Sequence, residues 1–447
     1  MVQRQLALFI SGLCVVMFDG GFATVVASRT ATSLTVVEEA PLVHTLEASF
    51  RVATPLTVEY WTADDGRLSV RSAAARTHEV PLVRLRPGRL YQYVVRETAT
   101  RGSFRTAPLP PDLAAVRFET SGKRSEPIAL VHLYSEDAAG FKGYVIVDES
   151  GEVVWYWRTK DFPFGAARRA NGNFVFMDKG RGVVEVSPAG EVVHETPQGD
   201  AEHEMHHDLI TTPNNTVLFL AFDTETFQDA RVKGEAIWEW SPDAGTLVKR
   251  WRSWDQLTPA LDRGPRFGGE WMHANSLAIG PRGNILVSVH YFNQVLSLAP
   301  DWRSIEWRLG GVRATIPVAS ADGFSGQHTA REIAPGRVIL FDNGRDRGAN
   351  SRVLEFAIDG ASATRVWEWS PKRPNFASAV SSARRLANGN TLVAFGMSAG
   401  RSDSSGPTEA FEVSATGSEL WHMVVSGTTT MFRVEPLTSI AGEVMRQ

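Results

Sequence analysis

A chain of 447 residues, 43% of them hydrophobic and 21% charged, is long enough for at least two folded domains with sizeable cores. Its 46 Lys and Arg against 50 Asp and Glu give a formal charge of -4 without a concentrated basic block, which argues against a nucleic-acid partner or an anionic membrane surface. The single cysteine, Cys14, excludes an intramolecular disulfide and a cysteine zinc site. Abundant glycine and proline together with 13 Trp favour an all-β chain.

Residues 1–27 have the pattern of a secretory signal peptide. An apolar stretch from Leu6 to Phe18 follows the basic start "MVQRQ", and "VVA" before Ser28 is a plausible cleavage point. The stretch is too short for a membrane span, and nothing after it reads as a transmembrane helix. We therefore expect an exported protein, periplasmic or secreted; an uncleaved apolar N-terminal segment is the alternative.

Residues 28–108 read as a small β-sandwich. Short segments of alternating polarity, "LTVEYW" at 56–61 and "LYQYVVRE" at 90–97, predict strands. The residues Leu85, Pro87, Gly88 and Tyr91 resemble the Leu-x-Pro-Gly-x-x-Tyr signature of fibronectin type III modules, in which the tyrosine closes a corner between strands. The proline-rich "TAPLPPD" at 106–112 predicts a stiff linker and a domain boundary.

Residues 109–447 contain an imperfect repeat. A turn followed by an apolar strand recurs, as in "RRANGNFVFMD" and "RRLANGNTLVAFG", and alternates with a strand ending in Trp or its substitute, as in "GEVVWYW" and "TRVWEWS". The second half occurs six times, and each copy supplies about four short strands with Asn-Gly or Pro-Gly turns. One such sheet cannot bury both of its faces, whereas six sheets arranged radially can. The repeat therefore predicts a six-bladed β-propeller.

Histidine is distributed unevenly, with seven of the 11 between residues 194 and 328. Four stand at comparable places in separate copies, at the start or the end of an apolar strand: His207, His273, His290 and His328. If the copies are blades, their innermost strands converge on the axis, so we expect these four imidazoles to meet in one pocket and to be catalytic. The neighbouring His206 is expected to support the site from outside or to lie at the surface.

Three side chains flank these histidines in the sequence, and one cation follows them. The amide of Asn275 or Gln327 is expected to fix an imidazole tautomer or to bind an oxygen, and Trp271 to wall an aromatic substrate. Arg331, three residues after His328, is the cation that could lean into the channel; a salt bridge elsewhere is the alternative.

The ordered segments "HHDL", "EWMHANSL", "ILVSVHYFNQV", "IEWRLGG", "GQHTAREI" and "LFDNG" resemble the bacterial arylsulfate sulfotransferase family over about residues 115–440. The resemblance implies a propeller that moves a sulfuryl group between phenolic compounds without the nucleotide donor PAPS and without a cofactor. It implies that His328 is transiently sulfated and that His207 and His273, with Asn275, assist. Where the family has an arginine that holds the sulfate, this chain has His290, which lacks a permanent cation.

The same substitution opens two alternatives. Four neutral imidazoles at positions 207, 273, 290 and 328 would suit one Fe, Cu, Mn or Zn ion, and thus a metal-dependent oxidase, oxygenase or lyase. In that case Glu204, Asp208 and Glu270 would orient the imidazole N–H groups. A propeller that binds a ligand without catalysis is the second alternative. The segment "LFDNGRDRG" at 340–348 lacks the spacing of a calcium loop and indicates a turn with a structural aspartate, Asp342.

Overall fold

The computed structural model describes residues 31–40, 42–197, 204–264, 269–348, 350–396, 406–426 and 429–446. The predicted signal peptide and Cys14 lie outside the described residues. The chain divides into two compact units, the first comprising residues 1–109, 188–190 and 439–447, the second residues 110–187 and 191–438. In the described ranges the regular structure is strand apart from one short α-helix, α1 (Pro111–Ala114), and three 3-10 turns, so the all-β prediction is confirmed.

The first unit is built on one antiparallel sheet with two long strands. The sheet contains β1 (Ala31–Ala40), β2 (Val43–Trp61), β3 (Arg67–Leu82), β4 (Leu90–Val95), β5 (Thr100–Arg105) and β31 (Val444–Arg446). The ladder between β2 and β3 is irregular around residues 49–56, and side chains from both halves of β2 enter one core. The sheet therefore folds over itself at this irregularity. The fibronectin type III topology stays a prediction.

The last strand corrects the predicted domain boundary. β31 pairs with β3, with Leu68 opposite Met445, so the chain's final residues belong to the first unit and not to the second. The Tyr91 hydroxyl accepts a hydrogen bond of 2.9 Å from the backbone N–H of Arg86. This bond ties the turn before β4 to the start of that strand.

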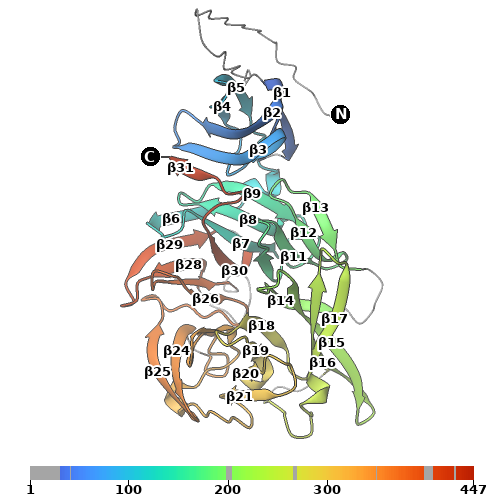
Figure 1. The fold of residues 1–447 in the computed structure, drawn as a ribbon. Coiled ribbons are helices and arrows are strands. Elements are labelled where there is room, and N and C mark those ends of the chain that lie inside the picture. The colour runs from blue at the N-terminus through green and yellow to red at the C-terminus, as the bar shows by residue number, and fades with distance from the viewer. Residues whose placement is uncertain are drawn as a thin grey trace, which may run out of the picture. The chain divides into compact units, whose positions relative to one another are not determined.

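The second unit consists, in its described residues, of six antiparallel sheets (Figure 1). In sheet order they are β30 (Thr429–Leu437), β7 (Ile128–Ser135), β8 (Lys142–Asp148), β9 (Val153–Arg158); β10 (Ala166–Arg168), β11 (Phe174–Asp178), β12 (Gly182–Val186), β13 (Val192–Glu195); β14 (Met205–Thr211), β15 (Val217–Phe227), β16 (Ala230–Ser241), β17 (Thr246–Arg252); β18 (Ala274–Ile279), β19 (Ile285–Val289), β20 (Gln294–Leu298), β21 (Ile305–Leu309); β22 (His328–Ala334), β23 (Arg337–Asp342), β24 (Arg352–Asp359), β25 (Ser362–Trp369); and β26 (Ser382–Arg385), β27 (Thr391–Phe395), β28 (Thr408–Val413), β29 (Glu419–Val425), β6 (Phe118–Gly122).

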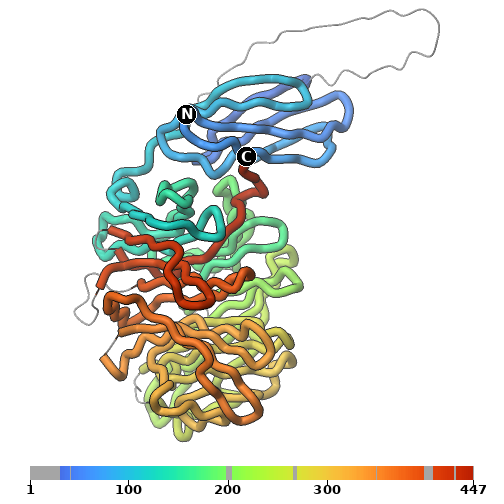
Figure 2. Tube along the Cα trace, turned by 90° about the vertical axis from the view of Figure 1, so that its left-hand side faces the viewer, coloured from blue at the N-terminus to red at the C-terminus, as the bar shows by residue number. Residues whose placement is uncertain are grey.

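The six sheets surround one axis. Their first strands contact one another in order, from β10 through β14, β18, β22 and β26 to β30, and residues of all six line a common cavity. This is the arrangement of propeller blades. The two ends of the unit close the ring, since β30 from the C-terminal side pairs with β7 and β6 from the N-terminal side pairs with β29. Figures 1 and 2 show the red strand β30 beside the blue-green strands of its sheet, next to β7.

The sequence pattern explains the position of each strand in its sheet. Strands near the axis are continuous runs of buried residues, as in β11 and β19, because neighbouring blades cover both of their faces. The outer strand β17 instead alternates, because one of its faces meets solvent. The predicted turns hold their special residues at positive φ, Gly172 at 89° and Asn215 at 62°, as tight hairpins require.

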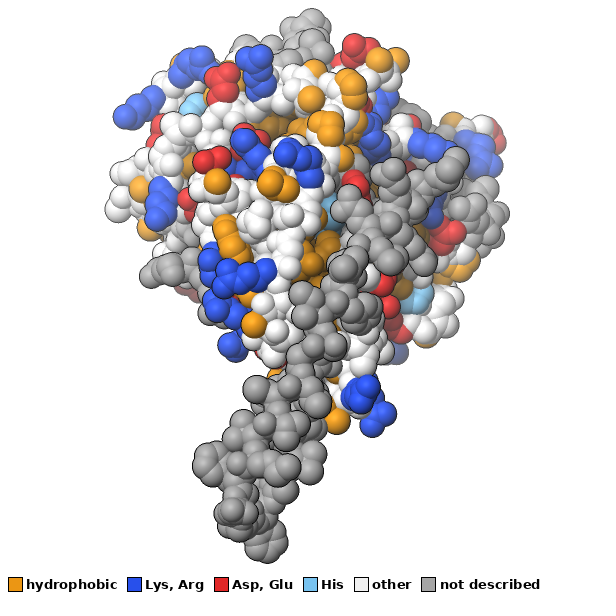
Figure 3. Space-filling view, turned by 90° about the horizontal axis from the view of Figure 1, so that it is seen from above, with side chains coloured by type: hydrophobic (Ala, Val, Ile, Leu, Met, Phe, Trp, Pro, Cys, Tyr) orange, Lys and Arg blue, Asp and Glu red, His pale blue; other side chains and the backbone are white. Residues whose placement is uncertain are grey.

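The described surface is mixed in charge. On the face drawn in Figure 3, Lys and Arg side chains lie in several separate groups with Asp and Glu side chains between them. Among the described residues, no helix is both long enough and apolar enough to span a bilayer.

Candidate active site

The four predicted histidines lie side by side at one end of the propeller axis. His207 is in β14, His273 directly precedes β18, His290 follows β19 and His328 begins β22. Their ring centroids are 4.7 Å apart for His207 and His273, 5.2 Å for His273 and His290, and 5.5 Å for His290 and His328. The structure therefore brings together residues that are up to 121 positions apart in the sequence.

A repeated backbone distortion positions these side chains. His207 and His273 have φ of 58° and 54°, and Thr329, beside His328, has φ of 50°. Each lies at or next to an irregularity in the ladder of its innermost strand. Positive φ is uncommon for residues other than glycine, and bulges of this kind re-aim side chains and concentrate near active sites. Three successive blades thus begin with the same strained feature next to a histidine.

The hydrogen bonds of His328 define its tautomer. Nδ1 lies 2.8 Å from Oδ1 of Asn343 and 3.1 Å from the carbonyl oxygen of Gly326. The Asn343 amide nitrogen donates to the carbonyl of Ala377, which fixes Oδ1 as the atom facing His328. Both partners of Nδ1 are acceptors, so Nδ1 carries the proton and Nε2 carries a lone pair.

The environment also keeps His328 neutral. Burial lowers its pKa to about 3, against the opposing effect of the Asn343 hydrogen bond. In the described part of the chain, Nε2 of His328 makes no hydrogen bond. The ring therefore has the neutral form and the open lone pair that a nucleophile needs.

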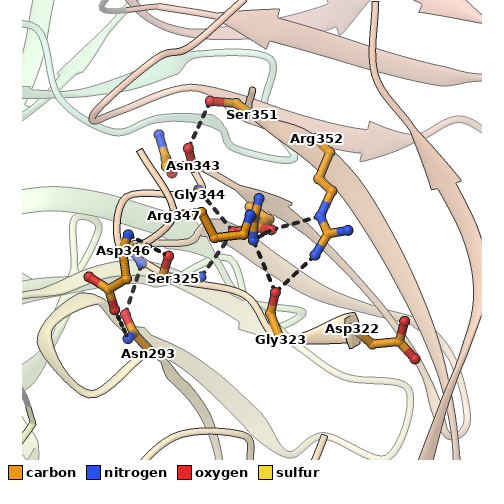
Figure 4. A network of polar contacts seen from close by, with 12 residues as sticks. Asn293, Asp322, Gly323, Ser325, Asn343, Gly344, Asp346, Arg347, Ser351 and Arg352 are labelled. Atoms are coloured by element: carbon orange, nitrogen blue, oxygen red, sulfur yellow. Dashed lines mark hydrogen bonds and ion pairs between the residues drawn. The ribbon is translucent and has the colours of Figure 1, made fainter. Parts of the chain in front are cut away.

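A polar network holds the loop that carries Asn343 (Figure 4). One oxygen of Asp342 accepts from the backbone N–H groups of Ser325 and Gly344, and the other accepts from Arg347 at 2.8 Å and Arg352 at 2.9 Å. Asp342 is therefore a structural aspartate, as the sequence indicated. Because Asp342 joins the segment before β22 to the end of β23, it helps to fix Asn343 against His328.

His207 has a buried chain of partners behind it. Its Nδ1 lies 2.8 Å from Nδ1 of His206, and Nε2 of His206 lies 2.9 Å from Oε2 of Glu235. The other Glu235 oxygen accepts from the backbone N–H of Ala274. Burial raises the pKa of Glu235 well above its ordinary value, and burial followed by the charge of His273 holds the pKa values of His206 and His207 well below theirs.

These shifts set the direction of the chain of hydrogen bonds. The raised pKa favours the protonated form of Glu235, and in that form Glu235 donates to Nε2 of His206, so that His206 carries its proton on Nδ1 and donates to Nδ1 of His207. The hydrogen of His207 is then on Nε2, the nitrogen opposite to this bond. His207 is thus presented as a hydrogen-bond donor, whereas His328 is presented as a lone-pair donor.

His273 is oriented by a carboxylate and by an aromatic ring. Its Nδ1 donates to Oε2 of Glu270 over 2.6 Å, and this bond lowers the pKa of Glu270. Tyr291 stacks on the ring at a centroid distance of 4.8 Å. Of the three carboxylates expected to orient imidazoles, Glu270 does so, whereas Glu204 pairs with Lys233 and Asp208 pairs with Arg433.

Aromatic side chains continue the row of histidines beyond His207. Phe164 and Phe432 lie 5.0 Å and 6.4 Å from the His207 ring, and Phe162 packs on both phenylalanines. Tyr134 in turn lies 4.8 Å from Phe162. These rings form an apolar wall directly beside the polar site, the pairing of surfaces that binds a polar group attached to an aromatic body.

The structure corrects two of the predicted substrate-binding residues. Trp271 is fully buried in the core between Trp254 and Phe292, and its indole N–H donates to the carbonyl of Asp262. Arg331 pairs with Glu435 and lines the cavity at the other end of the axis. Both side chains are committed to packing or ion pairing, so neither serves the role expected from its neighbourhood in sequence.

The two predicted amides have structural partners. Gln327 donates to the Val289 and Gln294 carbonyls, and its own backbone carbonyl accepts from the amide of Asn275 at 2.7 Å. Within the described ranges the side-chain oxygen of Asn275 is buried and has no hydrogen-bond partner. Gln327 therefore braces the segment before His328, and Asn275 keeps an acceptor available.

The metal alternative does not fit this arrangement. Among the described residues, no group of three or more His, Cys, Asp or Glu side chains is placed to hold one metal ion. The four imidazoles form a row of neighbouring rings, with adjacent centroids 4.7, 5.2 and 5.5 Å apart, and do not surround one point.

Sequence reasoning missed Glu235, Asn343 and the phenylalanine wall, and it gave His206 only a supporting or surface place. Glu235 lies in a strand read as blade packing, and Asn343 lies in a turn. The His206–His207 doublet was a visible sign of a paired imidazole. The partners of Glu235 and Asn343 come from other strands, so no local pattern marks them.

The model of the arylsulfotransferase (ASST) family matches residues 119–433, which is more than half of the chain and includes all four histidines. The chain belongs to the arylsulfotransferase (ASST) family. Membership of this family implies a transferase that acts on aryl substrates. No curated protein matches it.

Several solved structures are similar to this arylsulfotransferase-family chain at low sequence identity. A protein of unknown function from Bacteroides caccae is 13% identical, covering 70% of this chain and 100% of its own, with a TM-score of 0.48. A virginiamycin B lyase from Staphylococcus aureus is 8% identical, with 70% and 99% covered and a TM-score of 0.36. A gluconolactonase from Xanthomonas campestris is 15% identical, with 71% and 94% covered and a TM-score of 0.35.

Proposed function

We propose that this protein transfers the sulfuryl group of an aryl sulfate to a phenol, without PAPS and through a sulfated His328. The observation that carries the proposal is the tautomer of His328, whose Nδ1–H is held by Asn343 and Gly326 while Nε2 keeps its lone pair. In the first half-reaction Nε2 forms a bond to sulfur as the bond from sulfur to the phenolic oxygen breaks. In the second, an acceptor phenol attacks sulfur and the bond from sulfur to nitrogen breaks.

His207 and His273 supply the protons and the hydrogen bonds of this scheme. Sulfuryl transfer resembles phosphoryl transfer, in which charge on the peripheral and leaving oxygens must meet preorganised donors. His207 presents Nε2–H and gives its proton to the leaving phenolate, then recovers one from the acceptor phenol. His273 keeps its Nδ1–H on Glu270 and, in the imidazolium form, donates Nε2–H to a sulfuryl oxygen.

His206 and Glu235 act as positioning residues behind His207. As His207 loses its Nε2 proton, the proton on Nδ1 of His206 moves to Nδ1 of His207, and the Glu235 proton moves to Nε2 of His206. The negative charge then lies on the Glu235 carboxylate. In the second half-reaction the same proton transfers run in reverse. The phenylalanine wall beside His207 receives the aromatic body of donor and acceptor.

His290 takes the place of the family's sulfate-holding arginine in this proposal. It is buried and lies between the rings of His273 and His328. An imidazole in this position hydrogen-bonds a sulfuryl oxygen but lacks the fixed guanidinium fork. A His290→Arg variant is therefore expected to transfer faster.

The experiment is a colour assay with a matched covalent measurement. We expect release of nitrophenol from nitrophenyl sulfate to depend on an added phenol and to be abolished in His328→Ala. Quenched enzyme should carry one sulfuryl group on the peptide containing His328. Release without an acceptor requirement, or full activity in His328→Ala, would reject the proposal.

We also propose that residues 1–27 direct export of the protein. Sequencing the N-terminus of the mature protein tests this proposal.

A further inference from the structure

The propeller axis has a second opening, at the end away from the histidines. A cavity of about 540 Å³ is lined by the far ends of the same inner strands that carry the histidines. In β14, for example, His207 faces the histidine cluster, whereas Leu209, Ile210 and Thr211 line the cavity. At about 3.3 Å per residue these positions are on the order of 7–13 Å apart along the strand.

Cations dominate the polar lining of this cavity. Five arginines line it, Arg168, Arg331, Arg384, Arg385 and Arg433, against two glutamates, Glu332 and Glu435. Arg385 is paired with Glu355 outside the cavity, and Glu332 accepts from a backbone N–H and from Asn284.

One carboxylate, Glu435, is left facing three guanidinium groups. It pairs with Arg331 at 3.3 Å and with Arg384. Arg433 lies close enough to lower the pKa of Glu435 too, and its own ion pair, at 2.7 Å, is with Asp208. Three cations, Arg331, Arg384 and Arg433, are therefore matched by two carboxylates, Glu435 and Asp208, which leaves one positive charge in excess at the cavity wall.

These guanidiniums also have unused donors. In the described residues, Nε of Arg331 and Nε of Arg433 are buried and have no hydrogen-bond partner, and the Arg433 side chain is only 2% exposed. Burial above all, and then the charges of Arg384 and Arg433, lowers the pKa of Arg331 to about 10, although Glu435 opposes this effect. A buried N–H without an acceptor is costly, and an anion would relieve both the missing bonds and the mutual repulsion.

We propose that this cavity is a second anion site that binds a sulfate or sulfonate oxyanion through Arg331, Arg384 and Arg433. Tetrahedral oxyanions offer several acceptors to N–H groups that converge from different strands. Aliphatic side chains complete the lining: Leu130, Ile210, Ile279, Ile333 and Leu437. The site thus accommodates either inorganic sulfate or the sulfonate group of a compound with an apolar body.

The test uses the full-length His328→Ala protein, so that its result does not depend on sulfuryl transfer. Calorimetric titration with sodium sulfate and with benzenesulfonate, each at an ionic strength matched with sodium chloride, distinguishes the two sources of the anion. Loss of one charge-assisted hydrogen bond in Arg331→Gln should weaken binding by roughly tenfold or more. Arg384→Gln, a change at a more exposed arginine, should weaken it in the same direction.

Arg282→Gln removes one positive charge from an exposed residue that is not part of the cavity lining, and its affinity should equal that of the parent. A crystal soaked in selenate should show anomalous density between Arg331 and Arg433. Equal sulfate affinity in the Arg331→Gln, Arg384→Gln and Arg282→Gln proteins would overturn the proposal. So would selenate bound at the histidines alone, and in neither case would the proposed transfer reaction be affected.

Discussion

At the scale of single residues, two histidines of one cluster are prepared for opposite tasks by their hydrogen-bond partners. His328 meets two acceptors and keeps its lone pair on Nε2, while His207 meets a donor and keeps its hydrogen on Nε2. His328 is buried and His207 is partly buried, and burial lowers the pKa of both, so burial does not distinguish them. The partners distinguish the two histidines, Asn343 for His328 and His206 for His207, and each partner can be tested separately.

Asn343 should matter through the tautomer of His328. Replacing Asn343 by Ala removes the acceptor for Nδ1–H, so we expect kcat to fall about 10- to 100-fold, the usual effect of losing such a partner. Asn343→Asp keeps the acceptor for Nδ1–H but loses the amide that donates to the Ala377 carbonyl, so it should retain more activity than Asn343→Ala at a cost in stability. Steady-state kinetics and a thermal melt of both variants check this. Equal kcat in the two variants would show that the contact with His328 is immaterial.

Variants of Glu235 test its positioning role and its role in proton transfer separately. In Glu235→Gln the amide still donates to His206 and can still accept from Ala274, but it releases no proton. We expect this variant to fold normally and to lose kcat with little change in KM, while Glu235→Leu also loses stability because His206 becomes an unpaired buried group. The measurement is kcat and KM with a series of leaving phenols. Wild-type kcat in Glu235→Gln would limit Glu235 to a structural role.

At the scale of elements, the site depends on distorted strand ends and on tight connections. In three successive blades a residue at positive φ lies just before the inner strand or within its first three residues, and the turn before β22 brings Gly326, at φ 61°, against the His290 ring. A Cβ on Gly326 would lie 3.0 Å from Cε1 of His290 and 3.1 Å from Cβ of Arg345. The connection is thus packed to the limit directly beside the catalytic row.

We expect Gly326→Ala to displace His290 and to reduce transfer, in addition to a strain of about 1–2 kcal/mol from the positive φ. Gly348→Ala is the matched control, since Gly348 has φ of 55° with no atom within 4 Å of the added Cβ. It should show the strain alone, with activity retained. Chemical denaturation and the transfer assay report the two effects. Similar activity in both variants would contradict the role given to this contact.

At the scale of the whole molecule, burial of neutral histidines couples folding to pH. The pKa of His132 is lowered to about 3 by burial, and that of His44 to about 4 for the same reason. With His328 these residues occur in both units, so the coupling is not confined to the active site. An unfolded chain binds protons on these imidazoles at a pH where the folded chain does not.

Stability should therefore be complete above pH 6.5 and decline as the pH falls from 6.5 towards 3. Between these limits each such histidine removes about 1.4 kcal/mol per pH unit. In His132→Gln the melting temperature should be lower at pH 7, and the difference from the parent should shrink by pH 5. His194→Gln, at a half-exposed side chain, should lack this convergence. Parallel curves for parent and His132→Gln would refute the coupling.

Local sequence patterns were enough to predict much of the fold and the histidine cluster of the candidate site. Alternating polarity and Asn-Gly turns predict the hairpins, the repeat predicts sheets around an axis, and the histidine positions predict a shared cluster. These features are readable because strand period and turn conformation depend on neighbouring residues. The resemblance to arylsulfate sulfotransferases likewise rests on contiguous motifs.

Tertiary structure decided the rest, because it depends on groups from different strands meeting. The proton positions on His328 and His207 depend on Asn343 and Glu235, each from another strand or loop. Trp271 stands two residues before His273 in sequence yet faces the core, because the chain before β18 is not regular strand and His273 has a φ of 54°. The strand β31 joins the first unit by backbone pairing with β3. The sequence did not predict this pairing, because it leaves no mark on the side-chain pattern.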